Sequence, residues 1–248
     1  MTRYEVAGPT DAPAIVFVHA TRLTRGMWAP QVTGLSDTYR VITLDLPGHG
    51  TRSHERFTLD DAADAVSQVI DEAAAGRAIV VGLSLGGYVA MHLAGRTPER
   101  VRGLVLAGTS MEPAGIRAAP YRALGWVMAT FDGHGLETAN RWFFQTRYGP
   151  AIADPIVAGG FWASGGAEAL RCLAGHRFKP ALAAYPGPSL ILNGSLDLLF
   201  RVGERGFLEV AQDGRIVRLP KATHLSNLDR PAAFDRVVRR FAAELAPT

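Results

Sequence analysis

Short apolar runs alternate with longer stretches of helical periodicity along most of this chain, and this alternation limits its fold more than any other feature. Unbroken runs rich in β-branched residues are typical of strands covered on both faces; they lie at Ile15–His19, Arg40–Asp45, Ala78–Val81, Val101–Ala107, Ser189–Asn193 and Arg215–Leu219, with a shorter candidate at Thr2–Ala7. Helical patterns lie at Leu59–Ala75, Leu85–Gly95, Arg201–Ala211 and Ala232–Leu245. Since strands that alternate with helices require right-handed crossovers, the sequence predicts an α/β fold with a doubly wound, mostly parallel sheet flanked by helices.

Residues 111–185 interrupt this rhythm. They contain no convincing strand, yet they hold half of the aromatic residues of the chain, and glycine pairs at 159–160 and 165–166 are expected to break them into short helices. We therefore expect a core domain made of residues 1–110 and 186–248, with residues 111–185 as a helical cap insertion over the carboxyl edge of the sheet. Aromatic residues are common in ligand pockets, so the predicted substrate-binding residues are Trp28, Trp126, Trp142, Phe143 and Trp162. The alternative for each is simple packing.

Charge and cysteine content exclude several other classes of protein. Lysine and arginine number 26 against 23 acidic residues, a net charge of +3, and the basic residues are scattered, which argues against a nucleic-acid partner. The longest apolar runs fall far short of the roughly 20 residues that span a bilayer, so no membrane partner is expected. Cys172 is the single cysteine, which excludes an internal disulfide and a cysteine-based zinc site. No metal is expected, the default location is cytoplasmic, and the oligomeric state stays open.

The segment GLSLGG at residues 82–87 follows one predicted strand and precedes a predicted helix. This is a G-x-S-x-G pattern in the strand–turn–helix setting that makes it informative. The glycines allow a sharp turn that packs closely against neighbouring elements, so Ser84 is expected to be exposed at the edge of the sheet in a strained conformation. The sequence therefore predicts Ser84 as a nucleophile.

A serine hydroxyl needs a base that removes its proton. His224 follows the last predicted strand, and Asp197 follows the strand at Ser189–Asn193. Loops at the carboxyl ends of parallel strands converge on one crevice, so His224 is the expected base and Asp197 the acid that orients it. Taken singly, His224 could be a surface histidine and Asp197 an ordinary turn aspartate.

With Ser84, Asp197 and His224 in this order, the chain resembles the α/β-hydrolase superfamily over nearly its whole length. Within that superfamily it looks most like small capped esterases, enol-lactonases and cofactor-free perhydrolases. The resemblance implies an oxyanion hole formed by the backbone N–H groups of Leu85 and Thr21. Members usually carry His-Gly where this chain has His19-Ala20, and alanine resists positive φ, so the loop that supplies the second donor is expected to differ in shape. His19 is interpreted as a hydrogen-bonding residue that orients this loop.

These observations predict a serine hydrolase that cleaves a carboxylic ester or lactone of a small, largely apolar substrate through an acyl-enzyme, with no cofactor. One alternative is a carbon–carbon bond hydrolase or lyase-like synthase that uses the same residues. Another is a ligand-binding homologue that lacks the chemistry. Arg22 and Arg25 flank the entrance loop; an arginine there could pair with a substrate carboxylate, although solvated surface charge is the simpler interpretation.

Overall fold

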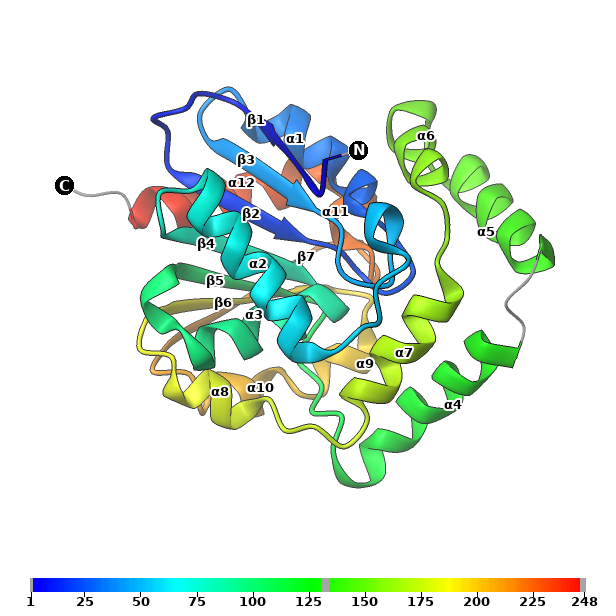
Figure 1. The fold of residues 1–248 in the computed structure, drawn as a ribbon. Coiled ribbons are helices and arrows are strands. Elements are labelled where there is room, and N and C mark those ends of the chain that lie inside the picture. The colour runs from blue at the N-terminus through cyan, green and yellow to red at the C-terminus, as the bar shows by residue number, and fades with distance from the viewer. Residues whose placement is uncertain (1, 131–133, 246–248) are drawn as a thin grey trace.

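The computed structural model describes residues 2–130 and 134–245. Seven strands form one sheet in the order β1-β3-β2-β4-β5-β6-β7, in which β1 is antiparallel to β3 and every other pair is parallel (Figure 1). The strands are β1 (Tyr4–Ala7), β2 (Ala14–Val18), β3 (Arg40–Leu44), β4 (Ala78–Leu83), β5 (Val101–Ala107), β6 (Pro188–Gly194) and β7 (Asp213–Leu219). The predicted mostly parallel, doubly wound α/β fold is confirmed.

Helices cover both faces of the sheet. One face carries α2 (Leu59–Ala73) and α3 (Leu85–Arg96), and the other carries α1 (Ala29–Leu35) and α12 (Pro231–Glu244) (Figure 1). Alternate residues of β2 divide between the two layers, because Val16 packs with α2 and α3 while Phe17 packs with α1 and α12. This double burial explains why the central strands read as continuous apolar runs. Short 3-10 turns lie at Arg25–Trp28, Gly50–Arg52, Pro98–Arg100 and Gly115–Arg117.

The helix predicted over Arg201–Ala211 is confirmed only in part, because it is not one continuous helix. Two short helices stand there, α9 (Leu198–Arg201) and α10 (Glu204–Leu208). Gly203 separates them, and its backbone lies so close to the carbonyl oxygen of Ser110 that a Cβ at this position would overlap it. A tertiary contact therefore divides a segment whose local pattern is helical. One further short helix, α11 (Ser226–Asp229), precedes α12.

Four helices, α4 (Ala118–Thr130), α5 (His134–Arg147), α6 (Pro150–Gly159) and α7 (Ala163–Leu173), lie between β5 and β6 in the chain. Figure 1 shows them beside the carboxyl ends of the parallel strands, where α4 packs against α7. The next helix, α8 (Lys179–Ala184), packs instead against α3. The base of the four-helix segment is closed by a hydrogen bond of 2.7 Å from the N–H of Gly175 to the carbonyl oxygen of Pro113.

The two glycine pairs of this segment differ in what they do. Gly159 and Gly160 end α6, as expected. Gly165 and Gly166 do not break a helix, because both lie inside α7. A Cβ at residue 165 would overlap the backbone of Gly48, so the glycine lets α7 approach the turn after β3. Gly165 and Gly166 therefore allow close packing of α7 and do not end a helix.

Candidate active site

Ser84 occupies a sharp turn between β4 and α3. Its backbone has φ 54° and ψ −115°, a conformation that is uncommon for any residue other than glycine. A Cβ at residue 82 would overlap the backbone of Gly86, and a Cβ at residue 86 would overlap the carbonyl oxygen of Val18. The surrounding backbone therefore fixes the turn, and the predicted strand–turn–helix geometry around Ser84 is present.

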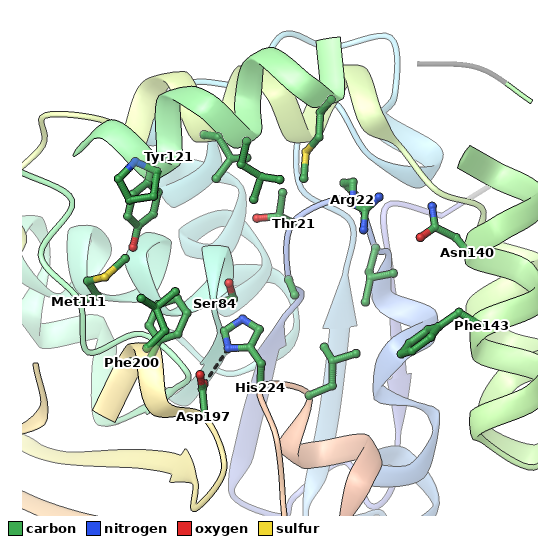
Figure 2. Close-up of a pocket in the computed structure, with 18 of the residues that line it drawn as sticks. Thr21, Arg22, Ser84, Met111, Tyr121, Asn140, Phe143, Asp197, Phe200 and His224 are labelled. Carbon is green, nitrogen blue, oxygen red and sulfur yellow. Dashed lines mark hydrogen bonds and ion pairs between the residues drawn. The ribbon is translucent and has the colours of Figure 1, made fainter. Parts of the chain in front are cut away.

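His224 and Asp197 come together from different loops. His224 follows β7, Asp197 follows β6, and the Nδ1 of His224 lies 2.8 Å from the Oδ2 of Asp197 (Figure 2). The ring of Phe200 stacks on the imidazole at a centroid distance of 4.6 Å and an interplanar angle of 22°. Since the carboxylate and the stacked ring hold the imidazole from two sides, its orientation is set before any substrate arrives. Sequence reasoning did not identify Phe200.

Ser84, Asp197 and His224 all line one cavity of about 440 Å³ (Figure 2). Most of the remaining wall is apolar. It includes Leu23, Met111, Tyr121, Leu124, Met128, Phe143, Phe144, Leu170, Leu199, Phe200 and Leu225. Carboxyl-end loops of the sheet form one side of this cavity and helices α4, α5 and α7 form the other.

Of the predicted substrate-binding residues, Phe143 lines this cavity and the four tryptophans do not. Trp28 is 0% exposed and packs in the core between Phe17 and Phe234, with centroid distances of 4.9 and 6.0 Å. Trp126 and Trp142 are 65% and 67% exposed, because they lie on the outer faces of α4 and α5. Trp162 donates from Nε1 to the carbonyl oxygen of Gly159 and borders a different depression. The structure therefore does not place these four tryptophans on the cavity that Ser84 lines.

Helical spacing rather than aromatic content would have identified the wall that α4 contributes. Tyr121, Leu124 and Met128 lie three and four residues apart, so they share one face of the helix, and all three line the cavity. Trp126 falls outside this face. Tyr121 is further fixed by a 2.6 Å hydrogen bond between its hydroxyl and that of Tyr88 on α3.

The loop after β2 is held by two buried histidines. The Nε2 of His19 accepts from the N–H of Leu46 at 3.0 Å, and its Nδ1 lies 2.9 Å from the carbonyl oxygen of Ala20. The Nε2 of His49 accepts from the N–H of Arg22 at 3.3 Å. Because each Nε2 accepts a hydrogen bond, both rings are neutral. Burial lowers the pKa of His19 and lowers that of His49 to about 3, in the direction that favours this neutral form. The predicted hydrogen-bonding role of His19 is confirmed.

Positive φ in this loop falls on Arg22, at 66°, and not on Ala20. Thr21 borders the cavity next to it. Within the described part of the chain, the N–H of Thr21 has no hydrogen-bond partner, and the N–H of Leu85, as the first residue of α3, has none inside its helix. Both predicted oxyanion donors are therefore unoccupied by the protein itself.

The buried carboxylate of Asp45 is fully engaged by neighbouring protein groups. It accepts hydrogen bonds from the backbone N–H groups of Arg25 at 2.9 Å and Thr51 at 3.0 Å, and it forms an ion pair with the Arg25 guanidinium. Arg25 also pairs with Glu5. Across residues 2–130 and 134–245 there is no group of three or more His, Cys, Asp or Glu side chains arranged to hold a metal ion. Nor does any helix in these ranges have the length and apolar character needed to cross a membrane.

Comparisons with known proteins agree with this geometry. The sequence model of the alpha/beta hydrolase family matches residues 15–237. The chain is 28% identical to 3-oxoadipate enol-lactonase 1 of Acinetobacter baylyi, over 97% of this chain and 92% of that protein. It is 30% identical to the pimeloyl-(acyl-carrier protein) methyl ester esterase of Neisseria meningitidis, with 94% of each covered. The solved enol-lactonase from Burkholderia xenovorans superposes with a TM-score of 0.82 and 27% identity, over 97% of this chain and 95% of that chain.

Proposed function

Because the chain belongs to the alpha/beta hydrolase family and is an ester hydrolase of that fold, we propose that it cleaves a small carboxylic ester or lactone through an acyl-enzyme on Ser84. The observation that carries this proposal is the convergence of Ser84 with the hydrogen-bonded His224–Asp197 pair on one largely apolar cavity. The names of the relatives, enol-lactonase and methyl ester esterase, fit the same chemistry.

The proposed reaction has two halves. His224 takes the proton of the Ser84 hydroxyl as its oxygen attacks the carbonyl carbon, and then gives that proton to the departing alkoxide. Asp197 holds the ring in the required tautomer and stabilises its charged form. The N–H groups of Leu85 and Thr21 stabilise the negative charge on the carbonyl oxygen. Water activated by His224 then releases the acid and restores Ser84.

We propose further that helices α4–α7 act as a cap that shapes the acyl site. Their residues Tyr121, Met128 and Phe143 border the cavity that Ser84 faces. An apolar wall of this kind excludes water from the reacting bond and favours apolar acyl chains.

The first test compares Ser84→Ala with Ser67→Ala on a panel of p-nitrophenyl esters and lactones. Ser67 lies on α2, away from the cavity. We expect kcat to fall by about 10³-fold or more in Ser84→Ala and to stay near wild type in Ser67→Ala. A fluorophosphonate probe should label wild type and Ser67→Ala but not Ser84→Ala. Ester turnover near wild type in Ser84→Ala would overturn the nucleophile, and faster cleavage of carboxylated dienones than of esters would favour carbon–carbon hydrolysis.

A further inference from the structure

Arg22 is a cation in an otherwise apolar part of the cavity. Its side chain lines the same space as Ser84 and His224, and Figure 2 shows it beside Thr21, on the side away from Ser84. Burial lowers the pKa of its guanidinium below the ordinary value. Arginine nevertheless remains charged at neutral pH, so the cavity contains a partly desolvated positive charge.

No acidic side chain among the described residues pairs with Arg22, in contrast to its neighbour in the same loop. Arg25 is satisfied by Asp45 and Glu5, and the other carboxylate on the cavity, Asp197, is engaged by His224. A partly desolvated charge without a partner costs free energy. The surrounding structure must therefore hold Arg22 in place, and an anion that enters the cavity would supply the missing partner.

Arg22 is held on three sides. Its N–H donates to the Nε2 of His49 at 3.3 Å, and its carbonyl oxygen accepts from the N–H of Trp162 at 2.9 Å. A Cβ added at Gly166 of α7 would lie 2.7 Å from the Cγ of Arg22, so the aliphatic stem packs directly on that helix. These contacts maintain the positive φ of 66°, a conformation that persists only where surrounding contacts enforce it.

Asn140 of α5 supplies a second polar group to the same part of the cavity. In Figure 2 its carboxamide points toward Arg22. The structure gives its side chain no hydrogen-bond partner within residues 2–130 and 134–245. A guanidinium and a carboxamide together present a planar fork of donors plus one further N–H, the arrangement that matches a carboxylate.

We propose that the substrate carries a carboxylate, and that Arg22 binds it with a bidentate pair of hydrogen bonds while Asn140 donates another. This inference rests on the proposed ester or lactone hydrolysis at Ser84. The substrate then spans the cavity, with its charged end at Arg22 and its ester carbonyl at Ser84. A neutral substrate of the same length leaves Arg22 without a partner and is selected against.

The test uses monomethyl esters of succinate, glutarate, adipate and pimelate beside methyl esters of the matching unbranched monocarboxylic acids. Each reaction consumes one water and yields the acid and methanol. We expect wild type to prefer at least one charged ester in kcat/KM, and Arg22→Gln to reduce the ratio of charged to neutral kcat/KM by about 10- to 100-fold. Glutamine keeps the Cβ of arginine and adds no strain at positive φ. Asn140→Leu should reduce the ratio less.

Arg122→Gln is the matched control. Arg122 is exposed on α4 and does not line the cavity, so this variant loses the same charge without losing the site, and its ratio should equal that of wild type. A ratio in Arg22→Gln equal to that of wild type would overturn the carboxylate proposal while leaving ester hydrolysis standing.

Binding without turnover separates the two proposals. Calorimetric titration of Ser84→Ala with each of the four monomethyl esters should give, for the ester that binds most tightly, a Kd that rises by about 10-fold or more when Arg22→Gln is added. Equal Kd values in the two variants would overturn the role of Arg22. If wild type hydrolysed no ester at all, the proposed function would fail, and the titration would still decide whether Arg22 binds the carboxylate.

Discussion

Asp235 on α12 is a buried carboxyl that the proposed chemistry does not use. Its side chain is 8% exposed, one of its oxygens lacks a hydrogen-bond partner among the described residues, and the other lies against the backbone of Gly34. Burial raises its pKa from 3.8 to about 6. The folded protein therefore holds this proton more tightly than the unfolded chain does, and the stability that this proton provides is present below about pH 4 and lost as the pH rises through 6.

Replacing Asp235 with Asn should consequently stabilise the protein at high pH. We expect the free energy of unfolding at pH 8 to rise by about 1–3 kcal/mol relative to wild type, since one pKa unit is worth about 1.4 kcal/mol, and the gain to vanish near pH 4. Urea unfolding at the two pH values measures this. Asp154→Asn, on the exposed side of α6, should change stability by less than about 0.5 kcal/mol at both. A gain independent of pH would contradict the titration.

Among single residues, the sequence predicted which polar side chains meet at one cavity better than it predicted which aromatic side chains line that cavity. Ser84, Asp197 and His224 could be selected because each follows its own strand, and parallel strands bring their carboxyl ends to one edge. Whether Arg22 was solvated or buried could not be read from the chain, because the answer depends on how closely α7 packs against its stem. Trp28 was misplaced for a similar reason, since only the packing of α1 and α12 determines that it lies in the core.

Among the elements, the turn between β4 and α3 tolerates the least change. A Cβ at residue 86 would overlap backbone atoms of β2, which cannot rotate away as a side chain can. Gly86→Ala should lower the free energy of unfolding by about 3 kcal/mol, as measured by urea denaturation. Gly149, at the start of α6, has φ −68° and open space around it, so Gly149→Ala should cost less than about 0.5 kcal/mol. Similar losses in both variants would mean that the turn can relax.

Strand positions followed directly from the sequence because the central strands are buried on both faces, which leaves an uninterrupted apolar signature. At the start of α2, Thr58 accepts an N-cap hydrogen bond from the N–H of Asp61 at 3.0 Å, a role that threonine favours directly before a helix. Patterns failed where a distant segment decides the local structure. Gly203 divides a helical sequence against Ser110, and Gly165 lies within a helix against Gly48. The residues next to Gly203 or Gly165 in the sequence do not reveal these contacts, because Ser110 and Gly48 are distant in the chain.

Across the whole molecule, one buried carboxylate joins the α4–α7 segment to the loop that carries His224. Asp229 accepts from Tyr148 at 2.8 Å and Arg147 at 2.7 Å, both on or next to α5, and from the N–H of Thr223 at 2.7 Å. Burial alone would raise the pKa of Asp229, but these hydrogen bonds outweigh it and hold the pKa below its ordinary value. The position of α5 and the position of the histidine are thus coupled.

Loss of this carboxylate should affect stability and turnover together. We expect Asp229→Ala to lower the free energy of unfolding by about 2 kcal/mol, because Tyr148 and Thr223 lose the acceptor of their partly buried hydrogen bonds, and to reduce kcat through displacement of His224. Tyr148→Phe removes a single hydrogen bond and should cost about 1 kcal/mol. Thermal unfolding and ester kinetics on the two variants measure both effects. Unchanged kcat in Asp229→Ala would show that the loop keeps its shape alone.

The hydrogen bond between Gly175 and Pro113 brings together the two ends of the segment that carries α4–α7. The chain leaves the core and returns to it at the same point, so residues 114–174 form one contiguous cassette between fixed ends. Ser84, His224, Asp197 and Arg22 all lie outside that cassette. A laboratory library confined to that stretch, with Arg147 and Tyr148 retained because they bind Asp229, should therefore vary the cavity wall while Ser84, Asp197 and His224 keep their places.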